Sequence, residues 1–166
     1  MIKVRLASDS DGSALARIDL ATWTSAVSPA PAPVDAAAYL FFTERTVPGD
    51  VLVAEVKGDV AGWVKVQSPT PLLSHAHVQE IGGLAVDPTH QGAGVGRRLV
   101  EAAVQECRRR GARKVTLRVL GPNTAARRSY ERCGFQVEGV LHEEFMLQGR
   151  YVDDVLMARQ LGEPVP

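Results

Sequence analysis

Three glycines on alternate positions mark one short stretch of this 166-residue chain as a candidate ligand site. The stretch reads QGAGVG and occupies residues 91–96, between an apolar run typical of a strand and a pattern typical of a helix. Glycine brings no side chain to pack and costs conformational entropy on folding, so this spacing indicates that a ligand approaches the backbone closely. Backbone amides at the positive end of a helix favour a phosphate or pyrophosphate. The alternative is a plain glycine-rich turn followed by two solvated arginines, Arg97 and Arg98.

Two familiar phosphate-binding motifs do not fit this stretch. A P-loop requires a lysine and a hydroxyl after its last glycine, but Arg97 and Arg98 follow Gly96. The dinucleotide fingerprint GxGxxG would place its third glycine at Arg97 or Leu99, and the stretch lies in mid-chain rather than after the first strand. The pattern that remains is Gln-x-x-Gly-x-Gly.

Composition excludes several classes of protein. Lysine plus arginine and aspartate plus glutamate number 19 each, so no net charge draws the chain to nucleic acid or to an anionic membrane. No apolar run is long enough to span a bilayer and the N-terminus does not resemble a secretory signal, which predicts a cytoplasmic protein. The two cysteines, Cys107 and Cys133, form no disulfide framework or metal-ligand pattern, and we expect both to be small apolar residues on helix faces.

Hydrophobic periodicity alternates between the strand and helix periods, which predicts one mixed α/β domain over residues 1–166. Gly82 and Gly83 interrupt one expected strand and indicate a bulge or a close backbone approach. Helices are expected at about 14–21, 35–45 and 95–110, with a short one between the GPN at 121–123 and Gly134. Strands are expected at 2–7, 51–56, 60–67, 77–86, 114–120, 135–146 and 151–158.

Three motifs in order give the chain a resemblance to a known family. They are LAVDP at 84–88, Gln91-x-x-Gly94-x-Gly96, and NTAARRSYERCGF at 123–135. Together they resemble the GNAT superfamily of acyl-coenzyme A dependent N-acetyltransferases, with a cofactor-binding core at about 78–135. The resemblance implies the α/β (α+β) GNAT fold, a mixed central sheet of about seven strands flanked by about four helices. It also implies a splayed gap, between the strands at 80–86 and 114–120, that admits acetyl-CoA.

The same resemblance assigns cofactor contacts. The backbone at 84–86 would pair with the pantetheine arm, the loop would cradle the pyrophosphate, and Asn123, which could also cap a helix, would touch the cofactor. No metal is expected. The implied cofactor-binding residues are Leu84, Ala85, Val86, Gln91, Gly92, Ala93, Gly94, Val95, Gly96, Arg97, Asn123 and Tyr130.

Acetyl transfer to an amine needs an oxyanion donor, a base and an acid. By resemblance, the Val86 amide is the oxyanion donor and Tyr130 protonates the leaving sulfur, although helical spacing alone would make Tyr130 a core residue. The resemblance also makes Glu80 the candidate base, because several family members carry a glutamate near this place, and an exposed carboxylate at a strand edge is its alternative. His142, beside Glu143 and Glu144, is the second candidate because histidine titrates in the useful range.

These residues predict an N-acetyltransferase that transfers an acetyl group from acetyl-CoA to a primary amine of a small molecule or peptide. The alternatives are a catalytically silent acyl-CoA-binding regulatory domain and a dehydrogenase-like nucleotide binder. Members of the superfamily often form homodimers, but the sequence gives no interface signal. A group of acids at the expected acceptor strands predicts a cationic amine: Glu80, Glu143, Glu144, Asp153 and Asp154.

Overall fold

The strands and helices lie close to where the periodicities predict them, with one exception. The computed structural model describes residues 1–162. Its sheet has the strand order β1-β2-β3-β4-β5-β7-β6, a mixed seven-stranded sheet as expected. The strands are β1 Ile2–Leu6, β2 Val51–Val56, β3 Asp59–Gln67, β4 Val78–Val86, β5 Lys114–Leu120, β6 Gln136–Leu147 and β7 Arg150–Gln160. The α-helices are α1 Gly12–Thr22, α2 Val95–Arg109 and α3 Thr124–Arg132.

Contacts divide the chain into two compact units. Unit 1 consists of residues 1–23, 32–67 and 81–106, and unit 2 consists of residues 24–31, 68–80 and 107–166. Strand β4 and helix α2 each contribute to both units. Two predictions depend on how the units are arranged: a single domain over 1–166, and a splayed gap between the strands at 80–86 and 114–120. Both stay predictions.

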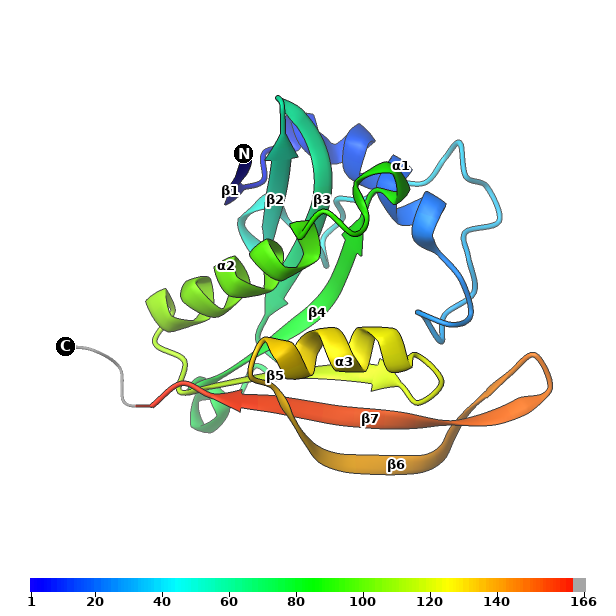
Figure 1. The fold of residues 1–166 in the computed structure, drawn as a ribbon, viewed down its shortest axis with the longest axis vertical. Helices are drawn as coiled ribbons and strands as arrows, with labels where there is room; N and C mark the ends of the chain where they lie inside the picture. Colours follow the sequence, from blue (N-terminus) through cyan, green and yellow to red (C-terminus); the bar gives the residue numbers. More distant parts are fainter. Residues whose placement is uncertain (163–166) are drawn as a thin grey trace. The chain divides into compact units, whose positions relative to one another are not determined.

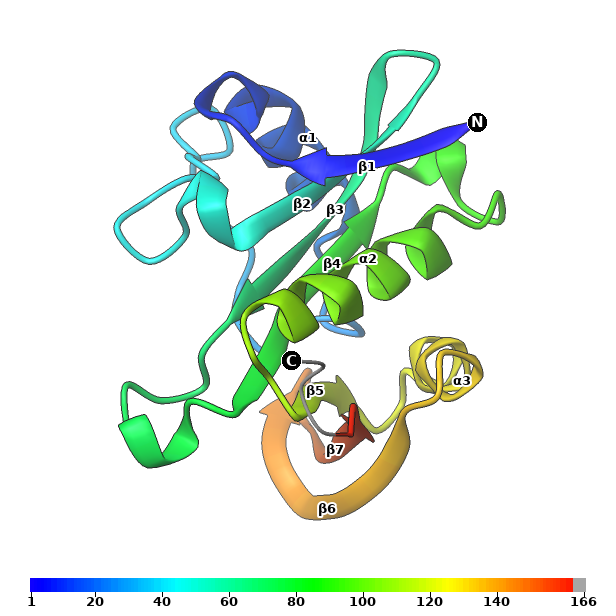
Figure 2. The same ribbon diagram turned by 90° about the vertical axis from the view of Figure 1, so that its left-hand side faces the viewer.

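Unit 1 packs helices on both faces of its strands. Val51 and Val53 of β2 alternate with Leu52, and their side chains join Leu15 and Ile18 of α1 in one buried cluster. On the other face, a Cβ on Gly62 of β3 would lie 3.1 Å from a Leu99 methyl of α2. Figures 1 and 2 show α1 and the first part of α2 on opposite sides of these strands. Burying each large apolar side chain contributes about 1.5–3 kcal/mol.

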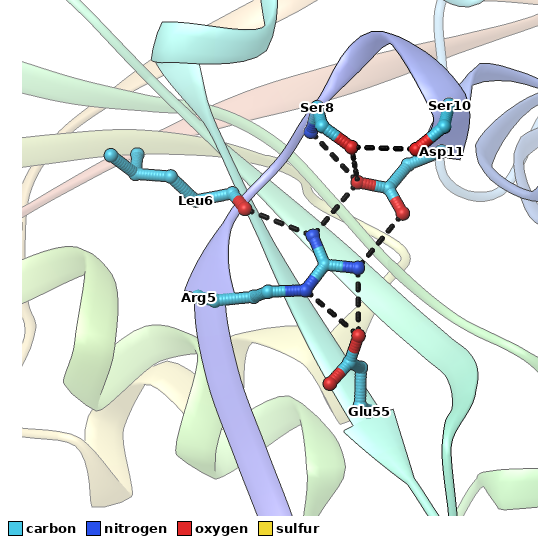
Figure 3. A network of polar contacts seen from close by, with 6 residues as sticks. All are labelled: Arg5, Leu6, Ser8, Ser10, Asp11 and Glu55. Atoms are coloured by element: carbon cyan, nitrogen blue, oxygen red, sulfur yellow. Dashed lines mark hydrogen bonds and ion pairs between the residues drawn. The ribbon is translucent and has the colours of Figure 1, made fainter.

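A charged network fixes the start of α1 (Figure 3). Arg5 donates from both terminal nitrogens to the Asp11 carboxylate, at 2.8 and 2.9 Å, and from Nε to Glu55 at 2.8 Å. The Ser8 amide donates to the same carboxylate at 2.8 Å. The hydrogen bond from Arg5 is the main reason that the pKa of Asp11 falls to about 2. The Asp11 carboxylate thus closes the capping box of the 3-10 turn Asp9–Asp11, which leads directly into α1.

Unit 2 is built on a long hairpin, drawn in orange and red in Figure 1. Strand β7 pairs antiparallel with β6 and with β5, and β4 pairs parallel with β5 through Val78–Glu80 and Lys114–Thr116. The hairpin turns at Gln148 and Gly149, whose φ angles are 50° and 75°. The end of α3 is held on β7 because Arg159 donates to the Cys133 carbonyl at 2.8 Å.

The helix expected at residues 35–45 is wrong, so residues 1–162 hold three α-helices where about four were expected. Asp35 accepts from the amides of Ala37 and Ala38 and starts one turn that does not continue. The Tyr39 hydroxyl donates to Asp19 at 2.5 Å, and the Phe41 ring lies 4.9 Å from that of Trp63. These contacts with residues distant in sequence fix a non-helical path, which local spacing does not predict.

Candidate functional site

The exit of β4 is fixed by a buried carboxylate. Asp87 accepts from the Thr89 amide at 2.9 Å and hydroxyl at 2.6 Å, and it caps the short 3-10 helix Pro88–His90. Arg17 of α1 also donates to it at 2.6 Å. The hydrogen bonds from Thr89 and then Arg17 hold the pKa of Asp87 well below its usual range. The LAVDP motif therefore ends on a carboxylate that stays charged and locks the chain just before the glycine loop.

The glycine loop is exposed, and its conformation requires glycine. Gly92 and Gly94 have φ angles of 78° and 83°, and a Cβ on either would meet no atom within 4 Å. Residues with side chains rarely adopt this left-handed conformation. Gln91 donates from Nε2 to the Val86 carbonyl at 3.3 Å and closes the turn back onto β4. Open space beside a backbone of this shape fits the predicted close approach of a ligand.

Helix α2 begins directly after the loop. The Arg98 amide donates to the Gly94 carbonyl at 3.1 Å, so the helical hydrogen bonds start there. The amides of Val95, Gly96 and Arg97 precede that bond and have no carbonyl partner within the helix. The exposed side chains of Arg97 and Arg98 pair with Glu101 instead, at 2.9 and 3.4 Å. The two arginine side chains therefore lie in solvent, as in the alternative interpretation of a plain glycine-rich turn. The backbone amides, in contrast, are suited to binding an anion.

The glycine pair in β4 is explained by two side chains of β3. A Cβ on Gly83 would lie 2.9 Å from the Trp63 ring, and one on Gly82 would lie 2.7 Å from the Gln67 side chain. Close approach is therefore the correct interpretation of the pair. Trp63 is 8% exposed, and its buried indole nitrogen has no hydrogen-bond partner among the described residues. The sequence around the two glycines does not reveal that Trp63 is the residue that approaches them.

In unit 2, Asn123 and Tyr130 lie at opposite ends of α3. The Asn123 side chain accepts from the Ala126 amide at 3.2 Å, which confirms the helix cap. Tyr130 is half-buried, and its ring centroid lies 6.0 Å from that of Phe135. Desolvation, with a smaller effect of Cys133, raises the pKa of Tyr130 to about 12. The phenol therefore stays protonated at neutral pH, as a proton donor must.

The two candidate bases lie on different strands of unit 2. Glu80 is half-buried on β4 in register with Thr116 of β5. His142 is exposed on β6, and its Nδ1 lies 3.1 Å from a carboxylate oxygen of Asp153 on β7. The Glu143 amide donates to the other oxygen at 2.9 Å. This amide and then His142 lower the pKa of Asp153. The sequence places His142 on its strand but does not reveal this partner.

Two of the five acids predicted to line the acceptor site are already paired within unit 2. Asp154 is buried and pairs with Arg118 of β5, whose Nε donates to it at 2.6 Å. Its charge is compensated inside unit 2, and Asp153 is engaged by His142.

The two cysteines, Cys107 and Cys133, differ in burial. Cys107 is buried, which raises its pKa to about 11, whereas Cys133 is partly exposed at the end of α3.

Comparison with known proteins decides the family. Residues 14–135 match the acetyltransferase (GNAT) family. The chain belongs to this family. It is 30% identical over 124 residues to the L-amino acid N-acyltransferase MnaT of Escherichia coli, a match that covers 74% of this chain and 72% of that protein. The resemblance found in the sequence motifs is therefore confirmed.

Two further relatives show how far the GNAT likeness extends. Mycothiol acetyltransferase of Amycolatopsis mediterranei is 39% identical over 101 residues, a match that covers 59% of this chain and 32% of that protein. The chain thus spans about a third of the length of this curated relative. The structure of yncA from Salmonella typhimurium, solved with its cofactor acetyl-CoA, matches with a TM-score of 0.80 and 24% identity, covering 100% of this chain and 97% of that one. It shows that the two share a fold.

None of the helices within residues 1–162 has the length and apolar character needed to cross a bilayer. Nor does that part of the chain bring together three or more His, Cys, Asp or Glu side chains that could hold a metal ion.

Proposed function

We propose that this GNAT protein transfers the acetyl group of acetyl-CoA to a primary amine of a small molecule or peptide. The observation that carries the proposal is the loop at 91–96, where two glycines in left-handed conformation precede helical amides without intrahelical partners. Family membership and the acetyl-CoA in the yncA structure support the same ligand.

The backbone of unit 1 offers groups for two parts of the cofactor. The amides of residues 92–97 would hold the pyrophosphate at the helix N-terminus, and the backbone of Leu84, Ala85 and Val86 would hold the pantetheine arm. Asp87 and Gln91 hold this backbone in place through Thr89, Arg17 and the Val86 carbonyl. Acetyl-CoA supplies the activated acetyl thioester.

The remaining roles fall to individual groups of the chain. The Val86 amide would donate to the oxygen that gains charge during attack. Tyr130, in unit 2, holds a proton that it can donate to the leaving sulfur, since its raised pKa keeps the phenol neutral. Glu80 would accept the proton of the amine directly or through water, with His142 as the second candidate. Asn123 would touch the cofactor while it caps α3.

A silent acyl-CoA-binding regulatory domain is not favoured, because relatives are named for acetyl and acyl transfer and a tyrosine, Tyr130, stands where the family resemblance expects the acid. The acceptor is not decided by those names, since one concerns mycothiol and another concerns L-amino acids.

Gly94→Glu tests the proposal most directly. Acetyl-CoA at about a hundred times its dissociation constant should stabilise the wild type by about 2.7 kcal/mol, measured as a rise in melting temperature. The glutamate should abolish this rise because it sets bulk and negative charge against the pyrophosphate. Thiol release with a panel of amines should be lost in parallel.

Gly58→Glu is the matched control. Gly58 turns the β2–β3 hairpin with a φ angle of 93°, and a Cβ there also meets nothing within 4 Å. The substitution brings the same backbone strain and charge to a different turn, so acetyl-CoA should still stabilise the variant. Stabilisation of the wild type by NAD but not by coenzyme A would contradict the proposal.

A further inference from the structure

A pocket of about 530 Å³ lies entirely within unit 2. It is formed by the segment after α1, the end of β5 and the β6–β7 turn, where Ser25, Leu120, Pro122, Leu147, Arg150 and Val152 line it. Small-molecule sites usually have volumes of about 300–1,000 Å³ and combine apolar walls with a few polar groups. This pocket has that composition, because aliphatic side chains surround the Ser25 hydroxyl, the Gln148 carboxamide and the Arg150 guanidinium.

The charges of the lining favour an anion. Arg150 is the charged residue of the lining, and no carboxylate contributes to it. The acids that follow on β7 are already engaged, Asp153 with His142 and Asp154 with Arg118. Within residues 1–162 no acidic side chain pairs with Arg150. Its guanidinium is therefore left to bind a ligand, contrary to the cationic acceptor predicted from the acidic residues.

The backbone fixes where Arg150 stands. Gln148 and Gly149 adopt the left-handed angles of a tight hairpin turn, and Arg150 pairs with Leu147 directly after it. At the β5 side, Pro122 precedes Asn123, the cap of the helix that carries Tyr130. The pocket thus adjoins, within unit 2, the turn that starts the proposed acid's helix.

We infer that this pocket binds the carboxylate-bearing part of the acceptor, and that the acceptor is an α-amino acid with an apolar side chain. The planar fork of Arg150 matches a carboxylate with two parallel hydrogen bonds. Ser25 offers a further donor, and the aliphatic walls accommodate the side chain. The inference rests on the proposed function and adds to it the substrate class and the residue that selects it.

Binding and turnover test the inference separately. L-leucine and L-leucinamide share the amine and side chain, but the amide lacks the carboxylate. Isothermal titration in the presence of coenzyme A should show that leucine binds and leucinamide binds much more weakly. Arg150→Gln should weaken leucine binding and raise its KM roughly 10- to 100-fold with little change in kcat, the usual effect of losing hydrogen bonds to a charged group. Arg150→Lys should restore part of the loss.

Arg45→Gln is the control, because it removes one exposed arginine charge outside the pocket and should leave leucine binding unchanged. Equal binding of leucine and leucinamide, an unaffected Arg150→Gln variant, or turnover of polyamines but not of leucine would each overturn the inference and leave acetyl transfer standing. Leucine binding that depends on Arg150, without thiol release from any amine, would instead uphold the pocket and refute the proposed transfer.

Discussion

The two units offer different kinds of group to a ligand. Both contain ion pairs, and in unit 1 the pairs of Arg5 with Asp11 and of Arg17 with Asp87 lower the pKa values of both carboxylates strongly. The groups that we propose for ligand binding in unit 1 are backbone amides of the glycine loop. In unit 2 the groups left available are side chains, including the phenol of Tyr130 and the guanidinium of Arg150.

This difference separates stability from chemistry. A paired carboxylate beneath a loop holds the backbone in place but does not contact a ligand, whereas a side chain that enters a pocket can exchange protons or select a substrate. We therefore expect substitutions in the unit 1 networks to lower stability and spare turnover. Substitutions of the available side chains of unit 2 should lower turnover and spare stability.

Tyr130→Phe should produce the largest loss of turnover. The ring and its contact with Phe135 remain, but the proton donor is removed, so kcat should fall about a hundredfold or more. Circular dichroism melting should change little. The raised pKa also predicts no alkaline loss of rate from Tyr130 between about pH 7 and 9 in the wild type. A folded variant with unaltered turnover would make Tyr130 a packing residue and would break the comparison.

Glu80→Gln and His142→Gln together identify the base. An amine must lose a proton to attack, so the wild-type rate should rise with pH, and removal of the base should depress it most near neutrality, by about a hundredfold. We expect this for Glu80→Gln, with coenzyme A affinity retained. His142→Gln should have a smaller effect, because that ring is exposed and bound to Asp153. Rate profiles against pH measure both; a Glu80→Gln profile that overlaps the wild type would move the role to His142.

Local patterns predicted most of the fold and the loop half of the site. Glycine tolerates the positive φ angles found at Gly92 and Gly94, so residue type alone indicates the loop. The apolar periods of α2 and β2 follow from burial of one face, so they indicate the helix and the strand. The expected helix at 35–45 failed because Phe41 packs on Trp63, which lies far along the chain. The partners of Asp154 and His142 were equally hidden, since pairing of β7 with β5 and β6 sets them. The cationic acceptor predicted from side-chain charges therefore stays a prediction, because the sequence does not show that Asp153 and Asp154 are already paired.

Asp11→Asn should have the smallest of these effects, and it should appear in stability alone. The folded-state pKa of Asp11 is lowered from 3.8 to about 2, so its charged form stabilises the fold above about pH 4, and this contribution disappears as pH falls through 2. The asparagine variant should be less stable than wild type by about 2 kcal/mol at pH 7, and the difference should vanish near pH 2. Urea unfolding across this range measures it, with kcat as the second readout. Asp153→Asn is the control, since that partly exposed carboxylate of unit 2 also has a lowered pKa but is less buried than Asp11. A pH-independent loss in Asp11→Asn, or a fall in its kcat, would show that the unit 1 network does more than hold the fold.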